Sequence, residues 1–294
     1  MLFITGANSF VGKALLNECK KRKIKFIGID KNCKESKNIF RVDITKDDIS
    51  LFLPKKSSII HLAAISTDKD CKQNFKLAIK TNIEGTQNLI EAAKKKHAKQ
   101  LIFASSEWIY GDIKSNTEKQ DEKKKIDLIN NSSEYAVTKI MGEKLCRFAS
   151  ESFVSTILRF GIIYGPRLNN WSAIENLFYN VATQSIIKVG SKLTSRRFIY
   201  VDDIVSGILS SVGRKESEVF NITGNKSIDL EKVITLSCKI LKKKIEIIET
   251  NKKNYSIRNP INNYAKKKLK WNPEINLEKG LKEINNFFLK NKIL

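Results

Sequence analysis

A glycine-containing turn between an apolar strand and a helix dominates the first thirty residues. Residues 2–5 predict a buried strand, and residues 10–20 predict a helix with an apolar stripe. Gly6 allows a tight turn between them, and Gly12 lets the helix pack closely on the strand. The helix N-terminus then offers free amides and a positive dipole to a phosphate group. The residues expected around such a phosphate are Gly6, Asn8, Ser9, Phe10, Val11 and Gly12.

Strands and helices alternate through the rest of the first half. Further strands are predicted at residues 26–30, 59–63, 101–104 and 155–160, and helices at 77–93 and 133–149. Strands that are apolar throughout, with helices between them, indicate a parallel sheet covered on both faces. The predicted fold is therefore α/β: a Rossmann-type doubly wound sheet over residues 1–165, completed by parts of 195–225. A smaller α/β substrate domain is expected over residues 166–294.

The second predicted strand ends in Asp30, about 18 residues after Gly12. A carboxylate at this place can accept hydrogen bonds from both ribose hydroxyls of NAD, and it repels the extra phosphate of NADP. We therefore expect NAD as the cofactor. The alternative is a structural turn followed by a solvated aspartate.

Composition narrows the class of protein further. No apolar run reaches the length of a membrane span, the N-terminus lacks the pattern of a secretion signal, and the five cysteines are scattered. This favours a cytoplasmic protein with reduced thiols and no membrane contact. The net charge of +23 comes mainly from lysines spread along the chain, without a stripe of arginines and aromatics. Solvated lysines are therefore expected rather than a nucleic-acid site.

The pattern Tyr135-Ala-Val-Thr-Lys139 carries the strongest chemical signal. Residues four apart share one face of a helix, so the Lys139 ammonium can lie beside the Tyr135 phenol. A neighbouring cation, together with the nicotinamide charge of the expected cofactor, favours the phenolate of a side chain whose usual pKa is about 10. Alone, such a pattern often marks only a helix surface. Here it follows the segment Ser105-Ser106-Glu107-Trp108-Ile109-Tyr110-Gly111 by about thirty residues.

Together these segments resemble the extended short-chain dehydrogenase/reductase family, in its NAD-dependent epimerase/dehydratase branch that modifies nucleotide sugars. The opening turn is similar to that family's T-G-x-x-G-x-x-G motif, with Ser9 at the middle glycine. The resemblance implies a catalytic set of Ser106, Tyr135 and Lys139, with Ser106 also contacting the substrate. It further implies a homodimer formed through the helices near 77–94 and 133–149.

The resemblance extends to binding residues. Asp43 and Ile44 resemble the pair that contacts adenine, and Leu62-Ala63-Ala64 resembles the wall beside the cofactor ribose. Arg196 matches an arginine that grips the substrate diphosphate; an ion pair with Asp202 or Asp203 is the alternative. Asn82 resembles a residue that ties the central helix to the neighbouring strand, and Ile162 stands where many members have asparagine.

Two residues bear on the type of reaction. Sugar 4,6-dehydratases of this family carry an acid two positions after the catalytic hydroxyl, where this chain has Trp108. If the strand continues, its alternation turns Glu107 away from the substrate. We therefore expect an NAD-dependent nucleotide-sugar epimerase similar to UDP-glucose 4-epimerase. The alternatives are a nucleotide-sugar reductase, a 4,6-dehydratase or a noncatalytic NAD- or RNA-binding relative. His61 and His97 lack the partners of a triad, and no metal site is expected.

Overall fold

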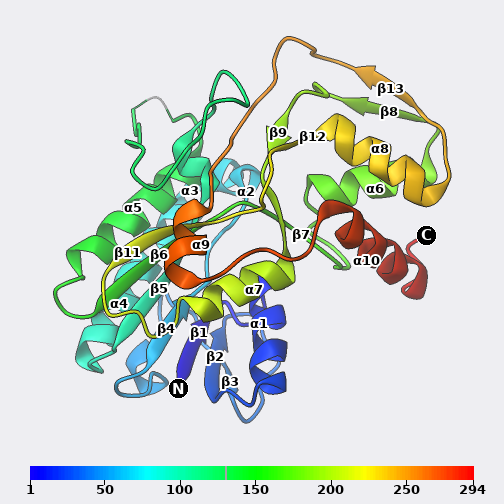
Figure 1. Ribbon diagram of the computed structural model, residues 1–294. Helices are drawn as coiled ribbons and strands as arrows, with labels where there is room; N and C mark the ends of the chain where they lie inside the picture. The colour runs from blue at the N-terminus through cyan, green and yellow to red at the C-terminus, as the bar shows by residue number, and fades with distance from the viewer. Residues whose placement is uncertain (130) are drawn as a thin grey trace. The chain divides into compact units, whose positions relative to one another are not determined.

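The computed structural model describes residues 1–129 and 131–294 (Figure 1). The chain divides into two compact units. The first, the sheet unit, comprises Met1–Ile109, Lys125–Phe160 and Val205–Phe220, and the second, the C-terminal unit, comprises Tyr110–Lys124, Gly161–Ile204 and Asn221–Leu294. This division departs from the expected boundary at residue 165, because Tyr110–Lys124 belongs to the second unit. The returning segment Val205–Phe220 falls inside the region 195–225.

A seven-stranded sheet in the order β11-β6-β5-β4-β1-β2-β3 forms the centre of the sheet unit. Its strands are β1 (Leu2–Thr5), β2 (Phe26–Asp30), β3 (Ile39–Arg41), β4 (Ser58–His61), β5 (Gln100–Ser106), β6 (Val154–Phe160) and β11 (Glu218–Ile222). Leu2 of β1 pairs in parallel with Phe26 on one side and Ser58 on the other. From β1 the chain adds β2 and β3 on one side of the sheet, and it then adds β4, β5, β6 and β11 on the other side. A doubly wound sheet binds ligands where this order reverses, beyond the carboxyl ends of β1 and β4.

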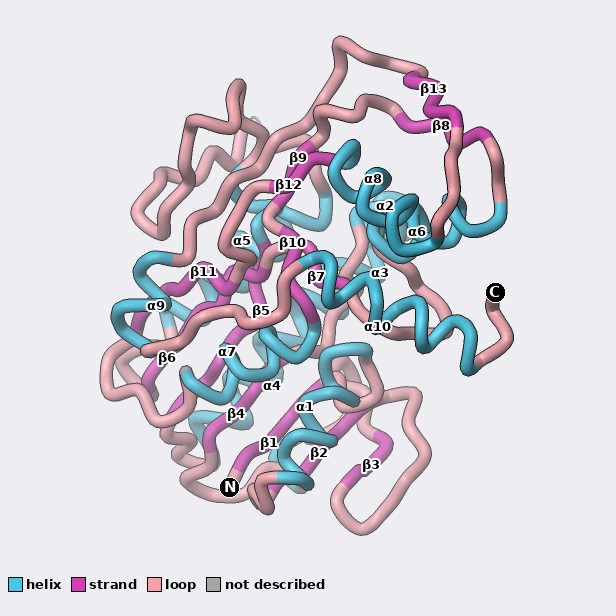
Figure 2. The backbone as a smooth tube through the Cα atoms, turned by 45° about the vertical axis from the view of Figure 1, so that its right-hand side comes forward, coloured by secondary structure: helices cyan, strands magenta, loops and turns pink. Residues whose placement is uncertain are grey.

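Helices cover both faces of this sheet, as the sequence predicts (Figures 1 and 2). Helix α1 (Phe10–Lys21) lies on one face, and α4 (Gly85–Lys95) and α5 (Glu134–Phe148) lie on the other. Buried side chains of α4 and α5 join those of the strands in one apolar cluster. Among its members are Phe3, Ile59, Leu89, Ile90, Leu101, Phe103 and Cys146.

The helix expected over 77–93 is interrupted. Helix α3 (Phe75–Ile79) runs into a π-helical turn, Lys80–Glu84, before α4 begins at Gly85. The buried Asn82 lies in the π turn, and its side chain binds both the amide (2.8 Å) and the carbonyl (2.9 Å) of Ile65. A π turn inserts one residue into the helical repeat. Contacts with a distant segment determine this insertion, so local periodicity does not reveal it.

The C-terminal unit contains three small sheets. Strand β7 (Ile162–Tyr164) pairs in parallel with β10 (Phe198–Tyr200), and β8 (Ile186–Val189) pairs in parallel with β13 (Glu246–Glu249). Strand β9 (Ser195–Arg196) is antiparallel to β12 (Ile228–Asp229). Its helices are α6 (Ala173–Thr183), α8 (Leu230–Leu241), α9 (Asn263–Leu269) and α10 (Leu277–Lys290), and α7 (Val201–Ser210) begins in this unit. In the described part of the chain, no helix is both long and apolar enough to cross a membrane.

Candidate active site

The turn after β1 is built around two glycines. Gly6 has a φ of +70°, and a Cβ atom there would lie 2.7 Å from the amide nitrogen of Ala63. A Cβ atom on Gly12 would lie 2.2 Å from the carbonyl oxygen of Gly6. Ser9, at the position of the family's middle glycine, caps α1 by accepting a hydrogen bond from the Gly12 amide (3.0 Å). The loop therefore keeps its shape with a serine there, because the side chain satisfies an amide at the helix N-terminus.

Asp30 fastens this turn to the loop after β2. Its carboxylate accepts hydrogen bonds from the backbone amides of Asn8 (3.0 Å) and Asn32 (2.9 Å). The carboxylate also faces a pocket formed within the sheet unit. Among the residues lining it are Gly6, Ser9, Asp30, Asp43, Ile44, Leu62, Ala63 and Ala64, all expected cofactor contacts. Of the other expected contacts, Asn8 lines a separate cavity, and Phe10, Val11 and Gly12 form the first turn of α1.

The far wall of this pocket is a turn that begins at Asp43. Its carboxylate accepts hydrogen bonds from the amide (2.9 Å) and the hydroxyl (2.8 Å) of Thr45. Burial alone would raise the pKa of Asp43, but these hydrogen bonds and nearby lysines hold it below its usual value. Asn88 on α4 donates to the carbonyl of Ile44 (3.0 Å). Asp43 is therefore a fixed negative group at the pocket's edge.

The three expected catalytic side chains come together at the end of β5. Ser106 is the last residue of that strand, and its hydroxyl is placed to lower the pKa of the Tyr135 phenol. Tyr135 and Lys139 lie on one face of α5, only 8% and 5% exposed. The Lys139 ammonium lies 5.8 Å from the centre of the Tyr135 ring and donates a hydrogen bond to the carbonyl of Ala104 (2.8 Å).

Burial dominates the electrostatics of this group. It raises the pKa of Tyr135, and the neighbouring Ser106 hydroxyl opposes this rise only in part. It also lowers the pKa of Lys139 to about 8, against the opposing influence of Cys71, Cys146 and Glu143. Burial therefore favours the neutral phenol in the protein alone. The expectation of a phenolate, which combines the Lys139 cation with the nicotinamide charge, stays a prediction.

Trp108 and Cys71 complete the surroundings of Tyr135. The Trp108 indole stands edge-on to the Tyr135 ring, with centroids 6.4 Å apart and an interplanar angle of 78°. Cys71 is buried in the same apolar cluster, and no sequence pattern marked it. The expected alternation past Ser106 does not apply, since β5 ends there and Glu107 begins a 3₁₀ turn, Glu107–Tyr110. Glu107 itself is fully buried.

A chain of hydrogen bonds connects the wall of the pocket with the π turn. The amide of Ala63 donates to the Thr5 hydroxyl (3.2 Å), which bonds Nδ1 of His61 (2.7 Å). Nε2 of His61 bonds the Thr86 hydroxyl (2.9 Å), which donates to the carbonyl of Asn82 (2.7 Å). Because Thr86 donates onward, it accepts from Nε2–H, and Nδ1 accepts from Thr5. Burial, with a smaller effect of Lys139, lowers the pKa of His61 to about 3, so the ring is neutral.

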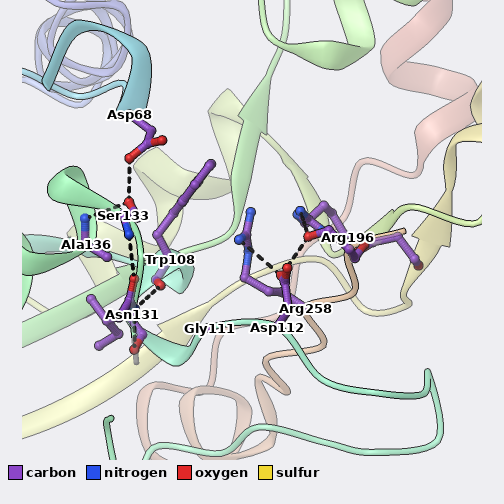
Figure 3. Close-up of polar contacts among 12 residues, drawn as sticks. Asp68, Trp108, Gly111, Asp112, Asn131, Ser133, Ala136, Arg196 and Arg258 are labelled. Carbon is purple, nitrogen blue, oxygen red and sulfur yellow. Dashed lines mark hydrogen bonds and ion pairs between the residues drawn. The ribbon is translucent and has the colours of Figure 1, made fainter. Parts of the chain in front are cut away.

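Arg196 lies in the C-terminal unit and is held by a second loop (Figure 3). Its guanidinium donates to the carbonyl (2.6 Å) and hydroxyl (2.5 Å) of Ser256, and that hydroxyl donates to Asp112 (2.6 Å). Asp112 also pairs with Arg258 (3.3 Å), a buried arginine that no motif singled out. Asp203 was the alternative partner for Arg196. Its carboxylate instead accepts hydrogen bonds from the backbone amides of Glu274 and Ile275.

Comparison with known proteins identifies the family. The model of the NAD dependent epimerase/dehydratase family matches residues 2–223. The chain belongs to this family. A UDP-glucuronate 4-epimerase from Thermodesulfobacterium geofontis is 30% identical over 94% of this chain and 83% of its own. A protein named as an uncharacterized UDP-glucose epimerase from Bacillus subtilis is 31% identical over 80% of each chain.

Solved structures agree on the fold. The UDP-glucuronic acid 4-epimerase from Bacillus cereus, in complex with NAD, superposes with a TM-score of 0.84 at 25% identity, covering 98% of this chain and 96% of that one. The UDP-glucose 4-epimerase of Thermotoga maritima has a TM-score of 0.86 at 24% identity and covers 99% of both chains. The epimerase/dehydratase assignment and the Rossmann-type α/β fold expected from the sequence are thus confirmed.

Proposed function

We propose that this protein is an NAD-dependent nucleotide-sugar 4-epimerase. The observation that carries the proposal is the grouping of Ser106, Tyr135 and Lys139 at the end of β5, in the sheet unit that also holds the pocket lined by Asp30. Relatives named as UDP-glucose and UDP-glucuronate epimerases, at 31% and 30% identity, support the same reaction. A decarboxylase of UDP-N-acetyl-glucosaminuronate from Bacillus cytotoxicus is less similar, at 27%.

The pocket suits NAD by its shape and charge. Side chains at Gly6 or Gly12 would collide with the chain's own backbone, so glycines are needed for the turn to present the N-terminus of α1 to a pyrophosphate. Asp30 offers carboxylate oxygens to ribose hydroxyls and repels a 2′-phosphate, while Asp43 and Ile44 form the edge expected to meet adenine. When bound, NAD supplies a group that accepts a hydride from the sugar carbon and returns it.

The protein's own side chains accept and return the proton of the reacting sugar hydroxyl. Tyr135 takes this proton as the sugar carbon is oxidised to a ketone, and gives it back when the ketone is reduced on its other face. Ser106 donates a hydrogen bond to the same oxygen. Burial opposes the phenolate that this transfer needs. The Lys139 charge, 5.8 Å from the ring centre, together with the positive charge that bound NAD would bring, would offset this cost. Each turnover restores the protonation state in which it began.

The C-terminal unit is proposed to bind the nucleotide diphosphate of the sugar. Arg196 and Arg258 share the neighbourhood of Asp112 and Ser256, and planar guanidinium groups bind phosphate oxygens in pairs. Arg258 extends the sequence-based expectation, which named Arg196 alone.

A homodimer is proposed on the exposed face of α5. Met141, Leu145 and Phe148 follow one side of this helix, and Phe148 is 77% exposed. A second copy of the chain would remove this apolar surface from water. A cytoplasmic location is proposed as well, supported by the five free cysteines.

The deciding experiment is a panel of UDP-, dTDP-, GDP- and CDP-sugars, with products resolved by NMR. We expect interconversion of two C4 epimers without net formation of NADH. Tyr135→Phe should lower kcat by about 10²–10⁴-fold. Loss of water, release of CO₂ or stoichiometric use of cofactor would replace the proposal with a dehydratase, a decarboxylase or a reductase.

A further inference from the structure

The first turn of α5, which carries Tyr135, is held by other segments of the sheet unit. On the amino side, Ser133, the N-cap of α5, donates its hydroxyl to the carboxylate of Asp68 (2.6 Å). On the carboxyl side, the carbonyl of Tyr135 accepts from the Thr138 hydroxyl (2.8 Å), and that hydroxyl accepts from Asn82 (2.9 Å). The position of the phenol therefore depends on Asp68 and Asn82 as well as on α5.

Both of these connections lead back to the wall of the nucleotide pocket. Asn82 clamps the amide and carbonyl of Ile65, which lines the pocket with Ala64. Asp68 follows Ile65 by three residues and opens the short helix α2 (Asp68–Gln73). The segment from the pocket wall to Asp68 is thus only three residues long, and it joins the wall to the residue that holds the N-cap of α5.

Asp68 makes the stronger of the two connections. Its carboxylate accepts a hydrogen bond from the hydroxyl of Ser133 (2.6 Å) and pairs with the ammonium of Lys72 (2.9 Å). Ser133 is the N-cap of α5 and accepts the amide of Ala136 (3.1 Å) (Figure 3). One carboxylate therefore holds the cap, and through the cap the first turn, of the helix that carries Tyr135. Hydrogen bonds to an ionised group are shorter and stronger than neutral ones.

The same cap is joined to the indole beside the phenol. The Asn131 side chain accepts the amide of Ser133 (3.1 Å) and donates to the carbonyl of Trp108 (3.1 Å) (Figure 3). Trp108 stands edge-on to Tyr135. The cap that Asp68 holds therefore also fixes the residue that packs on the Tyr135 ring.

We propose that Asp68 is a positioning residue that couples the nucleotide pocket to Tyr135. Occupation of the pocket orders the segment from Leu62 to Asp68, and Asp68 transmits this order to the first turn of α5. A displacement of about 1 Å in a reacting group can cost about 100-fold in rate. The kinetic part of this inference rests on the proposed function; the structural part requires only that NAD binds.

The structural part is tested by hydrogen–deuterium exchange with and without NAD. In the wild type, NAD should slow exchange of the amides of residues 134–137 as well as those of the pocket wall. In Asp68→Ala, exchange at 134–137 should be at least tenfold faster, and NAD should no longer slow it. Asp68→Asn keeps an acceptor oxygen and should restore part of the response.

Two variants serve as matched controls. Asp70→Asn removes the same charge from an exposed position on α2, and Lys72→Met removes the ion pair but keeps the carboxylate. Both should respond to NAD as the wild type does. Exchange in β5, residues 100–106, reports whether the fold is intact. If Asp68→Ala responds to NAD at residues 134–137 as strongly as the wild type, the coupling does not exist.

Kinetics separate positioning from binding. For the fully folded Asp68→Ala we expect kcat at least tenfold lower, with KM for the nucleotide sugar within about twofold, and partial recovery in Asp68→Asn. Equal kcat values for Asp68→Ala and Asp70→Asn would overturn the proposal. A wild type that binds NAD but turns over no sugar refutes the proposed function and leaves the exchange test decisive for Asp68.

Discussion

The ammonium of Lys139 donates its hydrogen bond to the carbonyl of Ala104, in the strand that ends at Ser106 (2.8 Å). This contact fixes a buried cation against β5, 5.0 Å from the centre of the Phe103 ring. The position of the positive charge beside Tyr135 is therefore set by the central sheet. The charge itself depends on pH, because burial brings the pKa of Lys139 to about 8.

The first prediction concerns this pH dependence. As pH rises through about 8, Lys139 loses its proton and its support for the phenolate, so kcat/KM should fall about tenfold per pH unit. In Lys139→Arg the guanidinium stays charged, and the fall should move to higher pH even if the maximum rate is lower. The check is a pH profile between 6 and 10. If kcat/KM falls at the same alkaline pH in the two proteins, deprotonation of Lys139 does not cause the fall.

The second prediction concerns the buried His61. Its pKa is about 3 in the folded protein and 6.5 as a reference value, so the unfolded chain binds more protons between these pH values. The stability that neutral His61 provides is complete above pH 6.5 and is lost as pH falls toward 3. The free energy of unfolding of the wild type should fall by about 1.4 kcal/mol more per pH unit than that of His61→Gln, between pH 6 and 4. Urea unfolding at several pH values measures this, and parallel curves would contradict it.

The third prediction concerns cofactor choice. Asp30→Asn removes the charge that we propose faces the ribose, so NAD should bind about tenfold more weakly and NADP should lose its electrostatic penalty. Asp30 also holds the amides of Asn8 and Asn32, and disturbance of the turn affects both cofactors alike. The ratio of the Kd for NADP to the Kd for NAD, both from calorimetric titration, therefore reports only the effect of the 2′-phosphate. If this ratio is the same in Asp30→Asn and the wild type, Asp30 does not determine the preference for NAD over NADP.

The fourth prediction concerns assembly. Phe148→Glu places a charge in the apolar face of α5 and should convert the proposed dimer to a monomer at micromolar concentration. Leu51→Glu is the matched control, since Leu51 is also 77% exposed but lies in the 3₁₀ turn Ile49–Leu51. Sedimentation velocity distinguishes the species. A monomeric wild type, or a dimer that survives Phe148→Glu, would rule out this interface.

Much of the sheet unit could be predicted because its signals are local. The strands expected at 2–5 and 26–30 have the predicted bounds, and α5 lies within a residue of the predicted 133–149 at each end. Apolar strands and amphipathic helices encode these elements in consecutive residues. Several elements of the C-terminal unit, including β8, β13 and α10, were not anticipated. Strands β8 and β13 are only four residues long and gain their partners from about sixty positions away.

The sequence by itself determined the α/β fold, the glycine turn and the spacing of Tyr135 and Lys139, because each depends on neighbours within a few positions. Tertiary structure alone decided which groups Lys139 and Asp68 hold, the π turn at Asn82 and the place of Arg258 beside Asp112. Asp68 and Ser133 are 65 positions apart, and Asp112 and Arg258 are 146 apart. Such pairs meet only after the whole chain has packed, so no local pattern encodes them.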